Sequence, residues 1–526
     1  MITFIPSWHE KTINNVSSDD LIGQVKSFMH SDDAYQVLVS NYMPFCRYFL
    51  HRYEILESNY WNLFDELQGI TEVQQRAVTL DDFDFDDDIR LIYTPFVILA
   101  RSDDQTIAEI RTEQSGQVQS ALYFKDGLPI YHDHYDDRGF ISSREIFQDE
   151  KLLYTSYFNL DGDWVLHEFA DSHVVKVNSA TNQYLSQLEY SNMHEIEFEM
   201  LNKKLSELDD NDSIVMSITD DNFMYMKNVK FKKQLTASFF ADRFTFSKDK
   251  KKMLKEFVTD IKSSLVDSDS NYEQLNKIVG DLNTIHKISP YDTRFEFGKS
   301  QEMKEEVIFF DARNLSDSDL HDAILEILKY IFKNMKKTGD EKEDRKIGLT
   351  LRGNLDDEDK LKGIVNEIIN QLYPDTLDLI KQFMELKASE NPVDQLYLLK
   401  FNSNVKFLAE VIEGIAYEII NTDDELMKSL NRARIIVDLS HQPDQFTQIA
   451  AISTGIPQIN MVKTEFVEEN KNGIVIKDIA SLKKALNRYL NQLKYWQDAR
   501  AYSAQKISQY SGDALKNYLL EITGEQ

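Results

Sequence analysis

The sequence lacks a second cysteine and a long apolar run. Cys46 is the single cysteine among 526 residues, so no intrachain disulfide can form, which fits a reducing compartment or indifference to redox. The longest apolar stretch, near Tyr93–Ala100, is far shorter than the roughly 20 residues needed to cross a bilayer. The opening MITFIPSWHE has no basic region followed by an apolar run of signal-peptide length. We therefore expect a soluble, cytoplasmic protein.

Basic residues are also scarce. The chain has 59 Lys and Arg against 89 Asp and Glu, a formal net charge of −30. Such an acidic chain repels phosphate backbones and anionic lipids, so we expect no nucleic-acid partner and no general attraction to membranes. The most basic stretch, Ser247–Phe257, is the obvious candidate for a local, peripheral contact with the inner face of the cell membrane. Its simpler interpretation is a solvated helix face.

The first half predicts an α/β domain with an inserted sheet. Apolar runs that alternate with helical periodicity indicate a parallel layer, with strands expected at Ile2–Ile5, Tyr35–Val39, Ile89–Leu99 and Ser213–Ile218. Between residues 107 and 179, Asp-Gly turn signals separate alternating apolar runs, a pattern typical of hairpins. We therefore assign residues 1–106 and 180–290 to a first Rossmann-like domain, and 107–179 to an antiparallel meander inserted in it.

The second half predicts another doubly wound domain over residues 291–479, followed by helices over 480–526. Ser316 is a plausible N-cap for a helix that reaches Met335. Strands are expected at Val307–Phe310, Ile347–Leu351, Leu396–Phe401, Arg434–Leu439, Gln458–Met461 and Gly473–Ile476. The predicted fold class is α/β throughout, apart from the antiparallel insert.

Familiar catalytic motifs are missing: there is no G-x-G-x-x-G, Walker loop, G-x-S-x-G or H-E-x-x-H. The acidic run Asp81–Asp88 contains a D-x-D triplet, but a solvated loop is favoured over a metal site. His132-Asp133-His134 would place two imidazoles on one face of a strand, as a metal pair requires. No third ligand of suitable spacing is evident, so a polar sheet surface is favoured and no metal or cofactor is expected.

The most informative segment is Arg434–Asn460. A buried strand leads into the polar loop Ser440–Asp444, and the helix that follows ends at Gly455 before the next strand. In open α/β sheets, ligands bind outside the carboxyl ends of the strands, and helix N-termini there favour phosphate. The loop Ser440–Thr447 is therefore where we expect a site, against the alternative of an ordinary strand–loop–helix unit.

This segment resembles the donor-binding half of retaining glycosyltransferases with the GT-B fold. Their pattern runs S-x-x-E-P-F-G, E-A-x-x-x-G-x-P and E-x-V-x-x-x-x-N-G, and this chain matches it at Pro443, Gly455, Pro457, Glu465, Val467, Asn472 and Gly473. The family's two acids fall on Gln442 and Ala450, and its Phe-Gly pair falls on Asp444-Gln445. The family also has an Arg and a Lys, five residues apart, after the first strand of this domain. Here Arg313 stands in the first position and Ser318 in the second. The resemblance thus implies a GT-B body whose donor site is degraded.

A narrower resemblance rests on three features, namely the opening FIPSW (Phe4–Trp8), the insert ending at Leu160–Phe169 and the chain length. In these features the chain is similar to the glycosyltransferase-like accessory secretory proteins, which belong to the accessory Sec systems of Gram-positive cocci. Those systems glycosylate and export serine-rich-repeat adhesins. The alternative in the same system is the noncatalytic subunit that stabilises the adhesin O-glycosyltransferase.

The resemblance implies two Rossmann-like domains facing a cleft, with the 480–526 helices crossing back to the first. It implies a noncatalytic protein, with no catalytic residue, that binds glycosylated adhesin. Its implied partners are the two other accessory secretory proteins and the accessory Sec motor ATPase. The residues expected to contact carbohydrate are Ser440, His441, Gln442, Thr447, Arg313 and Trp8. Two alternatives stay open. One is a divergent active transferase, in which Arg313, His441 and Gln442 hold a nucleotide sugar. The other is a scaffold that binds nothing.

Overall fold

The chain forms two compact units. The first comprises residues 19–290 together with both chain ends, and the second comprises residues 291–514. Among the residues described, no helix is both long and apolar enough to cross a membrane. The computed structural model describes residues 1–9, 19–29, 31–71, 76–86, 88–103, 105–113, 116–227, 229–282, 284–288, 297–335, 345–354, 357–388, 404–420, 423–508 and 512–524.

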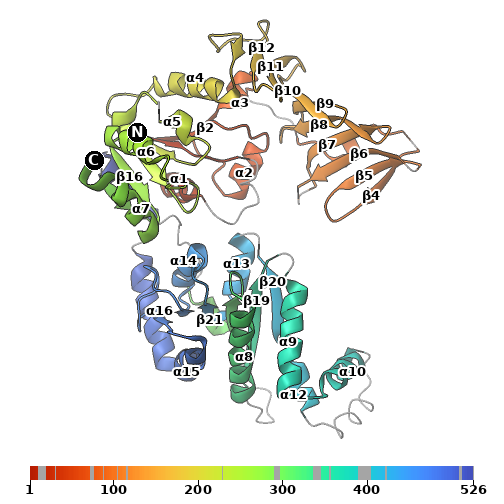
Figure 1. The fold of residues 1–526 in the computed structure, drawn as a ribbon, viewed down its shortest axis with the longest axis vertical. Coiled ribbons are helices and arrows are strands. Elements are labelled where there is room, and N and C mark those ends of the chain that lie inside the picture. Colours follow the sequence, from red (N-terminus) through yellow and green to blue (C-terminus); the bar gives the residue numbers. More distant parts are fainter. Residues whose placement is uncertain are drawn as a thin grey trace. The chain divides into compact units, whose positions relative to one another are not determined.

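The first unit is built on a parallel sheet of seven strands in the order β17-β16-β15-β14-β1-β2-β3 (Figure 1). Its strands are β1 (Ile2–Ile5), β2 (Tyr35–Val39), β3 (Tyr60–Asn62), β14 (Ser213–Ser217), β15 (Leu235–Phe239), β16 (Ser263–Val266) and β17 (Ile285–Lys287). Every residue of β1, β14, β15 and β16 is buried, as expected for parallel strands covered on both faces. The strands expected near residues 2, 35 and 213 are confirmed.

Helices fill the connections of this first sheet. They are α1 (Asp20–Met29), α2 (Cys46–Arg52), α3 (Leu63–Leu67), α4 (Met193–Leu205), α5 (Phe223–Met226), α6 (Lys251–Asp260) and α7 (Asp269–Val279). The single cysteine, Cys46, is buried at the start of α2, and burial raises the pKa of its thiol.

The insert is an antiparallel sheet of ten strands that follow one another in chain order, from β4 to β13 (Figure 1). They are β4 (Arg90–Tyr93), β5 (Ile98–Ser102), β6 (Gln105–Thr112), β7 (Val118–Lys125), β8 (Leu128–Tyr135), β9 (Ile141–Gln148), β10 (Lys151–Phe158), β11 (Trp164–Phe169), β12 (Val175–Val177) and β13 (Glu189–Tyr190). At the β7–β8 turn, Asp126 and Gly127 have φ of 54° and 79°, which a type I′ hairpin turn requires. The predicted meander is present.

The insert is larger than the predicted 107–179, because it begins at Arg90 and ends at Tyr190. The single parallel strand expected at Ile89–Leu99 is wrong. That run folds into the hairpin β4–β5, in which Ile92 lies opposite Leu99. The backbone N–H of Thr94 donates to the carbonyl of Val97 at 3.1 Å, so a turn interrupts what the sequence presents as one continuous apolar run.

Within the residues that the structure describes, the second unit has a parallel sheet of six strands in the order β20-β19-β18-β21-β22-β23. The strands are β18 (Glu305–Asp311), β19 (Lys346–Gly353), β20 (Ile415–Ile419), β21 (Ala433–Asp438), β22 (Gln458–Asn460) and β23 (Gly473–Val475). Five of the six strands predicted in this half are confirmed, and the one at Leu396–Phe401 lies outside the described residues. Strand β20 was not predicted.

Helices connect these strands: α8 (Asp317–Asn334), α9 (Glu358–Leu372), α10 (Leu377–Ala388), α12 (Val405–Glu413), α13 (Asp423–Leu430), α14 (Gln445–Thr454), α15 (Leu482–Asn491) and α16 (Leu493–Ile507). Ser316 caps α8 as expected, since its hydroxyl accepts from the backbone N–H of Asp319 at 3.2 Å.

The closing helices divide between the units, so the boundary expected at residue 479 lies too early. Helices α15 and α16 stay with the second unit, where Leu486 and Ala499 belong to its core. The last helix, α17 (Gly512–Thr523), packs in the first unit through the buried Leu515 and Leu519. The expected return to the first domain therefore holds for this helix, because its apolar stripe completes the core beneath β1 and β2.

We expect Leu519→Ala to destabilise the first unit by about 2–5 kcal/mol, because it opens a cavity at a fully buried position. The measurement is urea denaturation of the full chain. Leu493→Ala, at a leucine that is 64% exposed, is the matched control and should change the free energy of unfolding by less than about 0.5 kcal/mol. Equal stability of both variants would contradict the packing of α17 described above.

Candidate functional site

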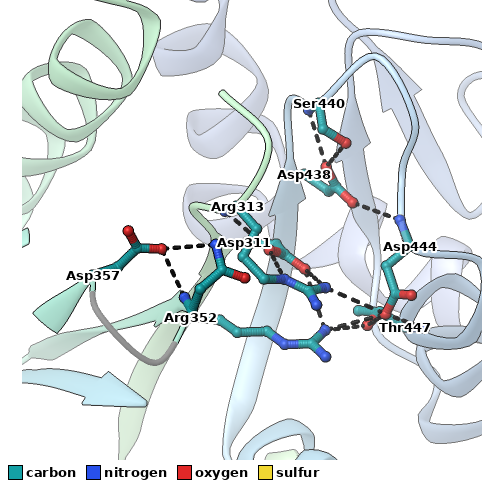
Figure 2. A network of polar contacts seen from close by, with 9 residues as sticks. Asp311, Arg313, Arg352, Asp357, Asp438, Ser440, Asp444 and Thr447 are labelled. Atoms are coloured by element: carbon teal, nitrogen blue, oxygen red, sulfur yellow. Dashed lines mark hydrogen bonds and ion pairs between the residues drawn. The ribbon is translucent and has the colours of Figure 1, made fainter. Parts of the chain in front are cut away.

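The candidate site lies at the carboxyl edge of the second sheet, where three strands bring charged residues together. Asp311 ends β18, Arg352 lies near the end of β19, and Asp438 ends β21. The parallel register pairs Asp311 with both Arg352 and Asp438, so the three form one row across adjacent strands. Helix α14 begins beside this row, with Asp444 at its N-cap (Figure 2). Apolar strands thus end in charges that must pair with one another.

Arg352 is the most deeply buried cation of this site, at 2% exposure. Its Nη1 donates to Asp311 Oδ2 at 3.2 Å, to Asp444 Oδ2 at 3.1 Å and to Thr447 Oγ1 at 2.9 Å. A guanidinium away from water requires such partners, because an uncompensated buried charge is strongly destabilising. These contacts join β18, β19 and α14.

Arg313 is half-buried and pairs with the same aspartate. Its Nε donates to Asp311 Oδ1 at 2.8 Å and its Nη2 to Asp311 Oδ2 at 2.7 Å, a two-pronged contact that fixes the guanidinium plane. Its Nη2 also lies 3.6 Å from Asp444 Oδ2. Burial lowers the pKa of Arg313, but the hydrogen bonds and charge of Asp311 outweigh this effect and raise it.

Asp444 places a carboxylate at the N-terminus of α14. It accepts a hydrogen bond from the backbone N–H of Thr447 at 3.3 Å and another from the Thr447 hydroxyl. Burial alone would raise the pKa of Asp444, but the charge of Arg352 and the Thr447 hydrogen bond hold it below its ordinary value. Helix N-termini at this edge of a sheet are where phosphate groups usually bind. Here the chain's own carboxylate fills that position.

Asp438 holds the loop that connects β21 to α14. It accepts hydrogen bonds from the backbone N–H of Ser440 at 3.0 Å, the Ser440 hydroxyl at 2.7 Å and the backbone N–H of Asp444 at 3.1 Å. Burial, together with the nearby charge of Asp311, raises the pKa of Asp438 to about 6. The residues Asp311, Arg313, Arg352, Asp438, Asp444 and Thr447 are called the ion-pair network below.

The predicted carbohydrate contacts have different surroundings. The hydroxyls of Ser440 and Thr447 are buried and engaged with Asp438 and the ion-pair network. His441 and Gln442 are exposed on the loop, so these two can reach a ligand. Arg313 follows β18 at the same edge of the sheet and is already paired with Asp311.

Trp8 lies in the core of the first unit. It is fully buried and packs on Phe49 with ring centroids 5.0 Å apart. Its ring therefore offers no exposed face to a sugar, and the structure does not support the carbohydrate contact expected at Trp8.

The residues that match the GT-B pattern have structural roles. Gly455 ends α14 with φ of 75°, and the Asn472 side chain donates to the carbonyl of Phe466 at 2.7 Å. A Cβ at Gly473 would lie 2.6 Å from the carbonyl oxygen of Gln458, so only glycine fits beside β22. Ala450, in place of one family acid, is buried in α14 and offers no polar group. The matched residues thus maintain the backbone and its packing.

Sequence analysis missed Arg352, Asp311 and Asp438. Each stands at or near the carboxyl end of an apolar strand run, and that position was the available signal. Which of these ends are neighbours depends on the order of the strands in the sheet, which the linear sequence does not state. Three carboxylates stand against two guanidinium groups in the ion-pair network, a formal charge of 2 − 3 = −1, so these five side chains offer no net positive charge to a phosphate group.

The fold defines the class of protein. The chain is similar to the pneumococcal O-GlcNAc transferase GtfA, with a TM-score of 0.67 and 14% identity over 100% of this chain and 99% of that one. It is also similar to TarM, with a TM-score of 0.60 and 14% identity over 100% and 99%. These likenesses show a GT-B glycosyltransferase-like fold, as expected.

The chain belongs to the family of accessory secretory protein 1 of the accessory Sec system, whose model matches residues 3–521. The curated member from Streptococcus gordonii is 30% identical over 97% of each chain, and that from Staphylococcus aureus is 27% identical over 99% of this chain and 98% of its own. The structure is also similar to a chain in the crystal structure of accessory secretory proteins 1, 2 and 3 of Streptococcus pneumoniae. That match has a TM-score of 0.81 and 26% identity over 100% of this chain and 99% of the other. The family predicted from sequence is confirmed.

We expect Asp438→Asn to remove a pH dependence of stability. Because the pKa of Asp438 is raised in the folded state, this carboxyl binds more protons when folded, so its contribution falls as pH rises from about 4 to about 6. The free energy of unfolding of the unaltered protein, minus that of the variant, should decrease by on the order of 1–3 kcal/mol between these limits. Urea denaturation at several pH values, with hydrogen exchange in β21, measures it. If the free energies of unfolding of the unaltered protein and the variant changed in parallel with pH, the raised pKa of Asp438 would be contradicted.

Proposed function

We propose that this chain is a noncatalytic, glycosyltransferase-like component of an accessory Sec export complex. In this proposal it binds a glycosylated serine-rich-repeat adhesin and assists delivery of that adhesin to the translocase. The observation that carries the noncatalytic part is the ion-pair network. The cations that could hold a nucleotide diphosphate are already paired with carboxylates of the chain.

The energetics favour this proposal over an active transferase. A diphosphate at this edge would have to displace Asp444 from the N-terminus of α14 and compete for Arg352, which is buried. Breaking a buried pair by removing one partner costs about 3–5 kcal/mol. The remaining carboxylates would then repel the incoming phosphate. A neutral glycan meets no such repulsion, and the exposed His441 and Gln442 offer it hydrogen-bonding groups.

The proposed partners follow from the family. The chain is similar, at a TM-score of 0.81, to members of solved complexes described as accessory secretory proteins 1, 2 and 3 and as the Gap123 complex of Streptococcus agalactiae. We infer that it assembles with the two other accessory secretory proteins and works beside the accessory Sec motor ATPase in the cytoplasm. The alternative of a subunit that stabilises the adhesin O-glycosyltransferase has less support, because the family model that matches is that of accessory secretory protein 1 of the accessory Sec system.

Ligand-observed NMR on the purified full chain separates the two classes of function. We expect no saturable binding and no nucleotide release with a panel of nucleotide sugars, and saturable binding of a glycosylated serine-rich repeat. The unglycosylated repeat is the control. If nucleotide is released instead, and Arg313→Ala abolishes that release, the chain is a divergent transferase and the noncatalytic proposal fails. If neither ligand binds, the adhesin-binding part fails and a scaffold remains.

We also propose a local membrane contact through α6, whose Lys251, Lys252 and Lys255 are exposed. Each basic residue near an anionic surface contributes about 1 kcal/mol, against the repulsion of the acidic chain as a whole. Flotation with vesicles of phosphatidylglycerol and phosphatidylcholine should therefore fall severalfold when these three lysines become Glu. The control is Lys483→Glu with Lys484→Glu, two exposed lysines of α15. Equal flotation of both variants would remove this proposal.

A further inference from the structure

The inserted sheet gathers two histidines and a glutamate that the proposed function does not use. His132 and His134 alternate along β8, so both side chains lie on one face of the sheet. Asp133 points to the other face, where it pairs with Arg144. Glu145 lies on β9 directly opposite His132 in the antiparallel register. The third ligand that the sequence did not reveal thus comes from the neighbouring strand.

The geometry is that of a convergent cluster. One ligand atom from each of the three residues can be chosen so that all lie within 4.8 Å of one another. Glu145 Oε2 lies 3.1 Å from His132 Nδ1 and 3.7 Å from His134 Nε2, and the two imidazole centroids are 4.3 Å apart. The side chains are 19%, 19% and 28% exposed, so the cluster is anchored in the sheet but open to solvent.

The cross-strand neighbours of the cluster carry no positive charge. His134 stands opposite Ser120 on β7 and Ser143 on β9, and His132 stands opposite Leu122 on β7. Both β8 and β9 are interior strands, paired on each side, so the backbone that carries the ligands is held in place before any ion arrives. Preorganised ligands whose direct cross-strand partners are uncharged favour a metal over a simple pair of histidines.

We propose that His132, His134 and Glu145 bind one divalent transition-metal ion of the Zn²⁺ class. Two imidazole nitrogens and one carboxylate oxygen are a ligand set that zinc takes up in tetrahedral geometry, with the fourth position left to water or another ligand. Hard ions such as Mg²⁺ prefer oxygen ligands and are disfavoured here. The competing explanation is a hydrogen-bonded His–Glu pair without metal, which satisfies the carboxylate but needs only one of the two imidazoles.

The test uses the tag-free full chain, stripped with a chelator and titrated with ZnSO4 by calorimetry. Co²⁺ is added separately, because its visible spectrum reports tetrahedral coordination. We expect one equivalent of Zn²⁺ to bind. His132→Ala, His134→Ala and Glu145→Gln should each weaken binding about tenfold or more, since each removes one of three ligands. His194→Ala is the matched control, because His194 also contacts a glutamate, Glu197, at 2.9 Å but has no second histidine in that contact.

Folding is checked separately. Glu145→Gln keeps the shape of the side chain, and all variants should retain the circular dichroism of the unaltered protein. Zn²⁺ should raise the Tm of the unaltered protein and leave that of Glu145→Gln nearly unchanged, because only a ligand that binds the folded state stabilises it. Absence of Zn²⁺ binding, or equal binding by the control and all three variants, would overturn the proposal.

Discussion

The carboxyl edge of the second unit's sheet depends on the pairing of one buried group, the guanidinium of Arg352. A cation without access to water must be paired, so β18 and α14 each supply a partner to β19. The parallel register makes this possible, since it aligns Asp311 with Arg352 on one side and Asp438 on the other. Asp438 in turn fixes the loop that delivers Asp444. The strand ends, the loop and the helix start are therefore arranged around one charge.

The residues that match the GT-B pattern can be considered apart from those that would contact a donor. The glycines and the asparagine that match the family pattern shape the backbone, and their loss would disturb packing whether or not a ligand binds. In the family pattern, Ala450 stands in the place of an acid and Asp444 in the place of the Phe of the Phe-Gly pair, and here Asp444 pairs with the buried Arg352. A fold and the site placed on it are separable in this way.

Most strands could be predicted from sequence, because apolar runs and Asp-Gly turns are local signals. The hairpin β4–β5 could not, since Thr94 and its turn sit inside a run that is apolar on both sides. The loop Ser440–Thr447 between a strand and a helix could be predicted, and so could the shared face of His132 and His134, from the period of two along a strand. Arg352 and Glu145 were missed for one common reason, namely that each meets its partners through strand pairing, and pairing is a long-range property.

The distribution of charge connects the chain's composition to its proposed ligand. A net charge of −30 and an excess carboxylate at the sheet edge act against any ligand that carries phosphate, whether nucleic acid or nucleotide sugar. They have little effect on an uncharged glycan, which is recognised by hydrogen bonds and apolar contacts. The chemical step of glycosyl transfer needs the diphosphate, whereas recognition of a finished glycan does not. This distribution of charge therefore supports the proposal that the chain recognises a finished glycan rather than transferring a sugar.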